Sequence, residues 1–265
     1  MKFFERAMEG RRALVTGAGS GIGRATAVAF AAADCRVALL GRTQDELCEV
    51  LEEIGGTARG HLTVAADVSR EEEMVSAADE ISAQWDSLDV VVANAGINGV
   101  WAPLDKLAVA EWDETLGINL RGTFLTVKVV LPLLRKNGGS VIVVSSINGN
   151  RIFSNSGATA YACSKAAQVA FAKMIALELA ADHIRVNVVC PGAIETNIDD
   201  STERRDTDSL HLPVEFPEGD VPLTEGRPGA AGDVANVICF LASDASSHVS
   251  GTELYVDGSQ SLLQG

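Results

Sequence analysis

The stretch TGAGSGIG, residues 16–23, joins a strand-like apolar run at 11–18 to an alanine-rich helical pattern that extends to about Ala33. Gly17, Gly21 and Gly23 permit a tight turn, a close approach of the backbone to a pyrophosphate, and close packing of helix on strand. A helix that begins here also presents free N–H donors and partial positive charge to a phosphate group. The stretch therefore predicts a dinucleotide site, although methyltransferases use a related glycine turn and such turns also serve packing alone.

The rest of the chain repeats this alternation of apolar strand and helical pattern. Several strands are almost continuous Val, Ile and Leu, which is typical of strands covered by helices on both faces. The alternation predicts an α/β fold: a doubly wound, mostly parallel sheet of the Rossmann type, in a single domain over 1–265 with about seven strands. Ser69 and Glu72 have the spacing of a helix capping box. Further strands are expected at 36–41, 62–68, 88–96, 139–146, 184–192 and 252–258, and further helices at 43–54, 69–85, 111–136, 160–181 and 232–242.

Composition and charge narrow the classes of function. Of the 265 residues, 47% are hydrophobic and 22% charged, which is enough apolar material to fill a core. A formal net charge of −15 argues against nucleic acid and anionic membranes as partners. No apolar run approaches the roughly 20 residues that span a bilayer, and the segment 1–10 lacks the apolar core of a signal peptide. We therefore expect a cytoplasmic protein.

The cysteines and histidines form no metal or disulfide pattern. Five scattered cysteines without a CxxC pair indicate reduced thiols, and four histidines without HExxH spacing argue against a metal site. No metal is expected. The cysteines are Cys35, Cys48, Cys163, Cys190 and Cys239, and Cys163 is expected in the core.

One long stretch, 193–230, shows no firm periodicity. Segments of this length without a pattern are usually functional lids or disordered. Because it follows the end of a strand, where ligands of such sheets bind, we expect a substrate lid. The segment contains ten Asp and Glu residues against three Arg.

The stretch YACSK, 161–165, places Tyr161 and Lys165 four positions apart, on one face of a helix. Such a pair is often only a surface contact. It also suits catalysis, since reduction of a ketone by hydride needs a proton delivered to the developing alkoxide. Tyrosine titrates near ~10, and a lysine at about 4 Å would favour the phenolate by roughly 4 kcal/mol, or about three pKa units.

Taken together, the motifs resemble those of the short-chain dehydrogenase/reductase family, in its TGxxxGxG and YxxxK branch. The resemblance covers almost the whole chain, and its motifs occur in the family's order. They are TGAGSGIG (16–23), DV (67–68), ANAG (93–96, where the family usually has NNAG), GINLRGTF (117–124), SS (145–146), YACSK (161–165) and PGAIET (191–196).

The resemblance implies a catalytic group of Asn119, Ser146, Tyr161 and Lys165. Tyr161 would be the general acid and base, Ser146 would hydrogen-bond the substrate oxygen, and Lys165 would also hold the nicotinamide ribose. Asn119 would hold a water that links the lysine to solvent. The expected cofactor-binding residues are Gly17, Gly19, Ser20, Gly21, Ile22, Gly23, Arg42, Thr43, Asp67, Val68, Asn94, Ala95, Gly96, Tyr161, Lys165, Pro191, Gly192, Ile194 and Thr196.

The sequence departs from the family pattern in two places, both in the C-terminal half of the chain. From Ser146 to Tyr161 is fifteen positions, about two more than in many members. Asn148 and Arg151 in this longer segment either line the substrate pocket or form part of a loop. The sequence DGS (257–259) stands where the family usually has DGG.

These features predict an oxidoreductase that transfers a hydride between NAD(P)(H) and a carbonyl or secondary alcohol. A non-catalytic dinucleotide-binding regulator and a methyltransferase are the alternatives from other classes. Within the oxidoreductases, a 3-oxoacyl thioester (acyl-carrier-protein) reductase and a dehydrogenase of small polar alcohols or sugars both remain open. The acidic segment 193–230 favours a small polar substrate, because it is a poor surface for an acidic carrier protein.

The end of the second expected strand bears on the choice of cofactor. NAD-specific sheets carry a carboxylate there that binds the adenosine ribose, whereas this chain has Gly41, Arg42 and Thr43. Asp34 lies at the far end of the strand. An arginine can bind a 2′-phosphate, so NADP(H) is expected to be preferred, with NAD(H) as the alternative. Ser20 stands where NADP-preferring relatives often carry a second basic residue.

The helices expected at 111–136 and 159–181 are apolar around much of their circumference, more than contact with one sheet requires. Extensive apolar faces mark interfaces, and the family commonly pairs these two helices across a two-fold axis. A homo-oligomer, most simply a tetramer, is expected.

Overall fold

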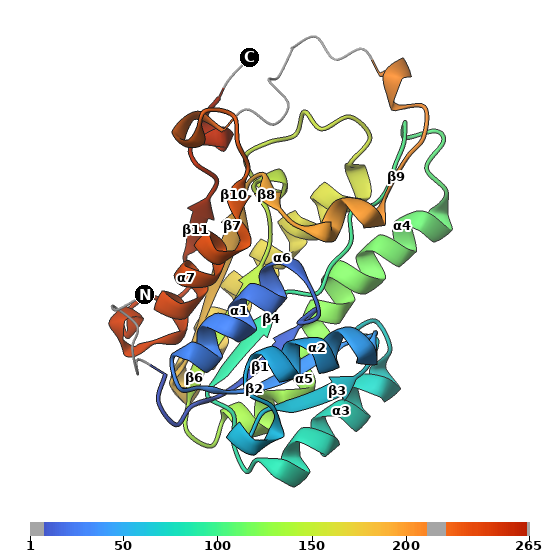
Figure 1. Cartoon of the computed structure of the whole chain (residues 1–265). Coiled ribbons are helices and arrows are strands. Elements are labelled where there is room, and N and C mark those ends of the chain that lie inside the picture. The colour runs from blue at the N-terminus through green and yellow to red at the C-terminus, as the bar shows by residue number, and fades with distance from the viewer. Residues whose placement is uncertain (1–7, 211–220, 264–265) are drawn as a thin grey trace.

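The computed structural model describes residues 8–210 and 221–263 and is built around one parallel sheet (Figure 1). Its seven strands lie in the order β11-β7-β6-β4-β1-β2-β3, and every neighbouring pair is parallel. The predicted doubly wound α/β fold is confirmed. The strands are β1 Arg12–Thr16, β2 Arg36–Gly41, β3 Leu62–Ala65, β4 Val90–Ala93, β6 Gly139–Val144, β7 Ile184–Pro191 and β11 Glu253–Val256.

The winding of the sheet changes direction between β1 and β4. From β1 the chain builds outward through β2 to β3, and it then returns to β4 on the other side of β1. In open sheets of this kind, ligands bind beyond the carboxyl ends of the strands at such a switch point. The loops after β1 and β4, which begin at Gly17 and Asn94, therefore flank the expected site.

Helices cover both faces of the sheet. Buried side chains of α3, α5 and α6 form the core on one face, and those of α1, α2 and α7 form the core on the other. Alternate residues of β1 supply both cores: Leu14 packs on the first face, and Ala13 and Val15 on the second. This explains the continuous apolar strands of the sequence. The α-helices are α1 Gly21–Ala32, α2 Gln44–Glu53, α3 Glu71–Gln84, α4 Val109–Leu116, α5 Gly122–Leu134, α6 Thr159–Glu178 and α7 Ala231–Ala242.

The helix expected at 111–136 is one stretch broken by a wider turn. A π-helical turn, Gly117–Arg121, separates α4 from α5. Contrary to the expectation that no apolar run is long enough, the 26-residue helical stretch Val109–Leu134 contains an 18-residue window with a mean hydropathy of 1.3, which is enough by length and composition alone to cross a membrane. Leu125 and Leu134 of this stretch belong to the core on the sheet, as in a core helix.

The segment expected to be a lid contains short pieces of structure. In its first part, β8 (Ile194–Glu195) pairs with β10 (Gly229–Ala230), and β9 (Thr202–Arg204) pairs with β5 (Gly99–Trp101). Residues 211–220 of the expected lid lie outside the described part of the chain. The chain after β7 is thus fixed to the loop after β4 by a parallel pair that the sequence did not suggest.

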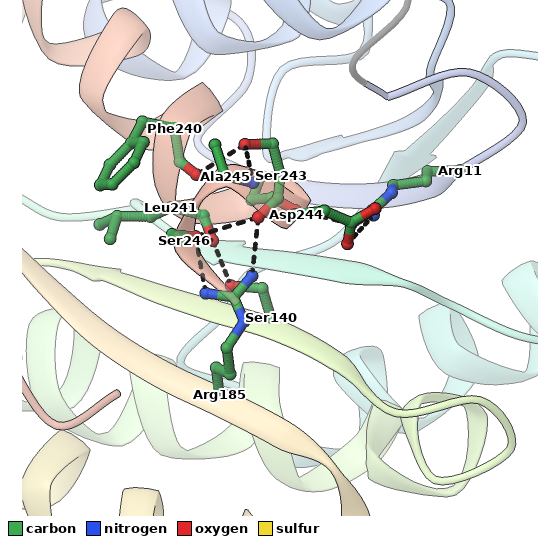
Figure 2. A network of polar contacts seen from close by, with 10 residues as sticks. Arg11, Ser140, Arg185, Phe240, Leu241, Ser243, Asp244, Ala245 and Ser246 are labelled. Carbon is green, nitrogen blue, oxygen red and sulfur yellow. Dashed lines mark hydrogen bonds and ion pairs between the residues drawn. The ribbon is translucent and has the colours of Figure 1, made fainter. Parts of the chain in front are cut away.

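At the amino end of the strands, two arginines hold the end of α7 (Figure 2). The last carbonyl groups of a helix lack partners within the helix and carry partial negative charge. Arg11 donates to the Ala242 carbonyl at 2.8 Å, and Arg185 of β7 donates to the Ser243 carbonyl at 3.2 Å and to Ser246 Oγ at 2.9 Å. The two side chains dock α7 on the sheet at the end opposite the expected site.

Two local expectations are wrong. Ser69 does not cap the third helix with Glu72. The helix begins at Glu71 after Arg70, and the Ser69 hydroxyl donates to Asp67 Oδ1 at 2.7 Å instead. Cys163 is exposed rather than in the core, and it is absent from the buried residues of α6.

Candidate active site

The four expected catalytic residues come from three elements and lie together. Ser146 follows β6, Tyr161 and Lys165 lie in the first turns of α6, and Asn119 lies in the π turn between α4 and α5. All four are buried, with exposed fractions between 0% and 8%. Ser146, Tyr161 and Lys165 line one cavity of about 560 Å³, which we call the catalytic cavity.

Asn119 is held behind this cavity by its own hydrogen bonds. Its Oδ1 accepts from the Ile97 amide at 2.8 Å, and its Nδ2 donates to the Ile97 carbonyl at 2.9 Å and to Ser164 Oγ at 3.0 Å. Its main-chain carbonyl accepts from Thr123 Oγ1 and from Gln168 Nε2. Asn119 thus joins the loop after β4 to α6, and a π turn is a common feature of functional sites in helices.

Ser146 is positioned by the short turn that follows β6. Its Oγ accepts from the Asn148 amide at 3.2 Å. A Cβ on Gly149 would lie 2.8 Å from the Lys165 carbonyl carbon, so this turn packs directly on the backbone of α6. Ser145 Oγ reinforces the contact by donating to the Lys165 carbonyl at 2.8 Å. The close contact fixes Ser146 relative to Tyr161 on α6.

The two titratable groups of the site are both shifted toward their neutral forms. Burial raises the pKa of Tyr161, a hydrogen bond with Ser146 partly offsets this, and the charge of Asp199 raises it further. Burial lowers the pKa of Lys165 to about 8. The expected lowering of the Tyr161 pKa by Lys165 is therefore wrong for this structure. Lys165 Nζ instead donates to the Val144 carbonyl at 3.0 Å.

A second cavity, of about 420 Å³, adjoins the glycine turn, and we call it the cofactor cavity. Gly96 lines both cavities, so they meet there. Among the expected cofactor-binding residues, Gly17, Gly19, Ser20, Arg42, Thr43, Asp67, Val68, Ala95 and Gly96 line the cofactor cavity. Ile22, Asn94, Gly96, Tyr161, Lys165, Pro191, Gly192, Ile194 and Thr196 line the catalytic cavity.

Gly21 and Gly23 line neither of these cavities, and Gly23 has a packing role. A Cβ on Gly23 would overlap the Gly17 carbonyl oxygen. Asn94 braces the same turn, since its Nδ2 donates to the Thr16 carbonyl at 2.9 Å and to the Gly17 carbonyl at 3.3 Å. A turn held tightly in this way leaves bare backbone facing the cavity, which fits a dinucleotide pyrophosphate.

Charged groups gather in the adenosine half of the cofactor cavity. Burial opposes ionisation of Asp67, but hydrogen bonds from Ser69 and the charge of Arg42 outweigh it and lower the Asp67 pKa. Glu46, in the first turn of α2, also lines this cavity, and a Cβ on Gly19 would lie 2.7 Å from its Oε2. No sequence motif marks Glu46, because it lies beyond the strand end, in the first turn of α2.

The outer wall of the catalytic cavity comes from segments that no motif marked. Asn98 and Trp101 from the loop after β4, and Asp199 and Arg204 from the chain after β7, all line it. Asn98 joins the two segments, since its Nδ2 donates to Thr202 Oγ1 at 2.7 Å. The pairing of β5 with β9 brings these side chains together.

Of the two residues noted in the longer segment after Ser146, one lines the pocket and the other belongs to the loop. Asn148 is buried and lines the catalytic cavity. Arg151 does not line it. Its guanidinium lies 3.4 Å from the centroid of the Tyr255 ring and donates to Ser261 Oγ at 3.2 Å. Arg151 therefore fastens the loop to β11 and the chain that follows it.

Comparison with known proteins agrees with this geometry. Residues 17–259 match the family model described as enoyl-(acyl carrier protein) reductase. The chain is 34% identical over 260 residues to glucose 1-dehydrogenase of Gluconobacter oxydans (strain 621H), covering 96% of this chain and 92% of the relative. The chain belongs to the short-chain dehydrogenase/reductase family. As a member of it, the protein is an oxidoreductase that transfers a hydride between a nicotinamide cofactor and a carbonyl or hydroxyl group.

Solved structures of family members superpose over nearly the whole chain. A crystal structure of a 3-ketoacyl-ACP reductase from Sinorhizobium meliloti 1021 matches with a TM-score of 0.89 and 54% identity, covering 96% of this chain and all of that one. A 3-ketoacyl-(acyl-carrier-protein) reductase from Brucella melitensis, complexed with NADH, matches with a TM-score of 0.83 and 30% identity, over 96% and 99% of the two chains. The named relatives carry names for different substrates, so membership of the family leaves the substrate of this protein open.

Proposed function

We propose that this family member interconverts a small polar ketone and its secondary alcohol, with Tyr161 transferring the proton and Ser146 hydrogen-bonding the reacting oxygen. The observation that carries the proposal is that the Tyr161 and Ser146 side chains line one cavity that meets the cofactor cavity at Gly96. A carbonyl bound between the two hydroxyl groups would lie next to a nicotinamide ring entering from that side. The cofactor, when bound, supplies or accepts the hydride.

The protonation states of the site suit the reduction direction. Because the Tyr161 pKa is raised, the phenol holds its proton at neutral pH and can give it to the developing alkoxide. Ser146 donates a second hydrogen bond to the same oxygen. Lys165, with a pKa of about 8, is mainly cationic at neutral pH and acts as a positioning residue for the nicotinamide ribose. Asn119 positions Ser164 and the Ile97 backbone around that lysine.

The glycine turn and the charged groups beside it would hold the rest of the cofactor. Gly19 and Ser20 at the start of α1 would take the pyrophosphate on backbone N–H groups. Arg42 would bind a 2′-phosphate, so NADP(H) is the proposed preference, with NAD(H) as the alternative. Asp67 and Val68 would contact the adenine.

The chain after β7 is the proposed lid over both cavities. Asn197 and Ser201 line the cofactor cavity, whereas Asp199 and Arg204 line the catalytic one. The acidic character of 193–230 favours a small polar substrate over an acidic carrier protein. An acyl-carrier-protein reductase remains the second candidate, favoured by the 54% identity to the Sinorhizobium meliloti protein named for that activity. We further propose a cytoplasmic homotetramer.

The test of the mechanism is Tyr161→Phe, which removes the hydroxyl and keeps the ring. Turnover of a panel of ketones and alcohols should fall by at least about 10²–10⁴-fold, as expected for loss of a general acid and base. Binding of the reduced cofactor, followed by its fluorescence, should survive. Tyr255→Phe, which changes the only other tyrosine of the chain, is the matched control and should keep its activity. More than about a tenth of the wild-type rate in Tyr161→Phe would overturn the proposed role.

A further inference from the structure

Arg204 is the cation on the substrate side of the catalytic cavity. It is the last residue of β9 and pairs in register with Trp101 of β5. Its guanidinium carbon lies over the Trp101 ring, 4.7 Å from the centroid, at the distance of a cation–π contact. Both side chains line the catalytic cavity. A contact of this kind restricts the guanidinium through its face and leaves its N–H groups available to a ligand.

No carboxylate neutralises Arg204 within the described ranges 8–210 and 221–263, where no ion pair or side-chain hydrogen bond involves its guanidinium. Its neighbour behaves differently. Arg205 forms a two-point ion pair with Glu111 of α4, with N–O distances of 3.0 and 2.6 Å. Successive residues of a strand point to opposite sides. Arg205, which directly follows β9, therefore fastens the end of this strand to α4, whereas Arg204 lines the catalytic cavity.

The catalytic cavity is also lined by side-chain amide groups that have no hydrogen-bond partner among the described residues. Asn148 is 7% exposed and lines the cavity, and its side-chain amide has no hydrogen bond to any described residue. Asn155 lines the same cavity, and only its main-chain carbonyl is engaged among the described groups. A side-chain amide that faces a cavity without a protein partner is available to bind a polar ligand.

The charges of the cavity are arranged to orient an anionic substrate. Asp199 interacts with Tyr161, whose pKa it helps to raise, and it accepts from Asn98 Nδ2 at 3.4 Å. A negative charge near the reacting end repels an anionic group from the tyrosine. Arg204 attracts that group to the wall formed with Trp101. Opposite charges placed in this way select one orientation of the substrate.

We propose that Arg204 binds a carboxylate of the substrate, so that the substrates are small oxo acids and the matching hydroxy acids. This inference rests on the proposed function and names its substrate class. The reacting carbonyl would lie at Ser146 and Tyr161, and Asn148 and Asn155 would bind polar groups between the two ends. A single planar guanidinium matches a carboxylate in shape and charge. A phosphate dianion would keep one negative charge uncompensated by this single guanidinium.

The experiment compares acids with their uncharged esters. Reduction of acetoacetate, levulinate and their methyl esters is measured in the wild type and in Arg204→Gln, Arg204→Lys and Arg227→Gln. Arg227 is an exposed arginine of the same segment that lines neither cavity, and it serves as the control. The wild type should prefer at least one acid over its ester by about 10–100-fold in kcat/KM, mainly through KM, as expected for hydrogen bonds to a charged group.

Arg204→Gln should remove this preference, Arg204→Lys should keep part of it, and Arg227→Gln should leave it unchanged. Equal use of acids and esters by the wild type, or a preference that survives Arg204→Gln, would overturn the proposal. Two further substrates test whether the site prefers a phosphate or an acyl thioester to a carboxylate. Higher kcat/KM for hydroxyacetone phosphate, or for acetoacetyl N-acetylcysteamine thioester, than for either acid would also overturn it.

A binding measurement separates failure of this inference from failure of the proposed function. Thermal unfolding of the protein with oxidised cofactor is followed with levulinate and with its methyl ester. A rise in Tm with levulinate that disappears in Arg204→Gln supports the carboxylate site even if no carbonyl is turned over. Turnover of carbonyls without any acid preference contradicts the carboxylate site alone and leaves the proposed function standing.

Discussion

The Nζ atom of Lys165 lies 5.6 Å from the centroid of the Tyr161 ring and donates to the Val144 carbonyl at the end of β6. The two side chains are neighbours on one face of α6, yet the cation is held by backbone rather than by the phenol. Both are buried, and burial favours the neutral form of each. The site thus contains a buried cation whose retention is explained by function rather than by stability.

The first prediction is that Lys165→Met stabilises the fold while abolishing turnover. The Lys165 pKa falls from 10.5 in the unfolded reference to about 8. This shift corresponds to about 3 kcal/mol of unfavourable free energy for the charged form. The penalty is fully present below pH 8, declines as pH rises, and is absent above pH 10.5. Loss of the hydrogen bond to Val144 offsets about 1 kcal/mol of the stability gained by removing this penalty.

Urea unfolding of Lys165→Met at neutral pH should therefore give a free energy of unfolding about 1–3 kcal/mol above that of the wild type. The gain should shrink as the pH is raised toward 10. Lys128→Met, which removes an exposed lysine of α5 paired with Glu71, is the control and should change stability little. A destabilised Lys165→Met, or a gain that does not depend on pH, would contradict this account.

The architecture was predictable because each of its determinants is local in the sequence. Uninterrupted apolar runs such as 139–146 can only be strands covered on both faces, and alternation with helices then determines a parallel sheet. The glycine turn at 16–23 is likewise a contiguous motif, and it predicts at which end of the sheet the cofactor binds. The π turn at Gly117–Arg121 was not predictable, since it depends on contacts of Asn119 with the Ile97 backbone and with Gln168.

The substrate wall could not be predicted because it arises from pairing between distant segments. Trp101 and Arg204 meet only through the register of β5 with β9, two strands of three residues each that lack a hydrophobic pattern. Glu46 was missed for a similar reason, since its carboxylate reaches the cofactor cavity by packing against Gly19. Side-chain direction and tertiary packing, rather than residue type, decide both cases.

The second prediction concerns the anchoring of α7. Arg185 is half-buried and donates to the Ser243 and Val249 carbonyls and to Ser246 Oγ. Arg185→Met leaves these acceptors without their partner, and the free energy of unfolding should fall by about 2–4 kcal/mol. kcat and KM of the folded fraction should stay unchanged, since this network lies at the amino end of the strands. Urea unfolding and steady-state kinetics provide the two measurements.

Arg24→Met is the matched control for Arg185→Met. Arg24 makes an exposed ion pair with Glu53 at 2.9 Å, and such pairs contribute about 0–1 kcal/mol. If the two variants lose stability equally, the Arg185 network has no special role in docking the helix.

The third prediction concerns assembly. Met174 and Leu177 on α6 are 75% and 84% exposed, and Phe124 on α5 is 43% exposed. Apolar side chains gathered on two neighbouring helices indicate an interface. Sedimentation should show a homo-oligomer, most simply a tetramer, at micromolar concentration. Met174→Glu combined with Leu177→Glu should produce a smaller species, because charges would be buried in the interface.

Val75→Glu is the control for this assembly prediction, since Val75 is a 46% exposed apolar residue that lies on α3 and not on either of the two proposed interface helices. It should leave the sedimentation coefficient unchanged. A wild-type monomer at micromolar concentration would overturn the proposed assembly.

The final prediction concerns the choice between NADPH and NADH, for which two opposite charges share the cofactor cavity. Arg42 lines this cavity and lowers the Asp67 pKa by its charge, so its guanidinium acts on the adenosine half. Glu46 lines the same cavity beside Gly19. A 2′-phosphate would be attracted by Arg42 and repelled by Glu46. The preference for NADPH should therefore be real but smaller than an arginine alone would give.

Comparing kcat/KM for NADPH and NADH in three variants tests this balance. Arg42→Ala should lower kcat/KM for NADPH by about 10–100-fold and affect NADH little, since a hydrogen bond to a charged group contributes about 1.5–3 kcal/mol. Glu46→Gln should raise use of NADPH relative to NADH, because it removes the repulsion and keeps the shape. Glu49→Gln, an exposed residue of α2 outside the cavity, should change neither. Equal use of both cofactors by the wild type would contradict the NADP preference. If the ratio of kcat/KM for NADPH to that for NADH is the same as in the wild type in both Arg42→Ala and Glu46→Gln, neither side chain interacts with the 2′-phosphate.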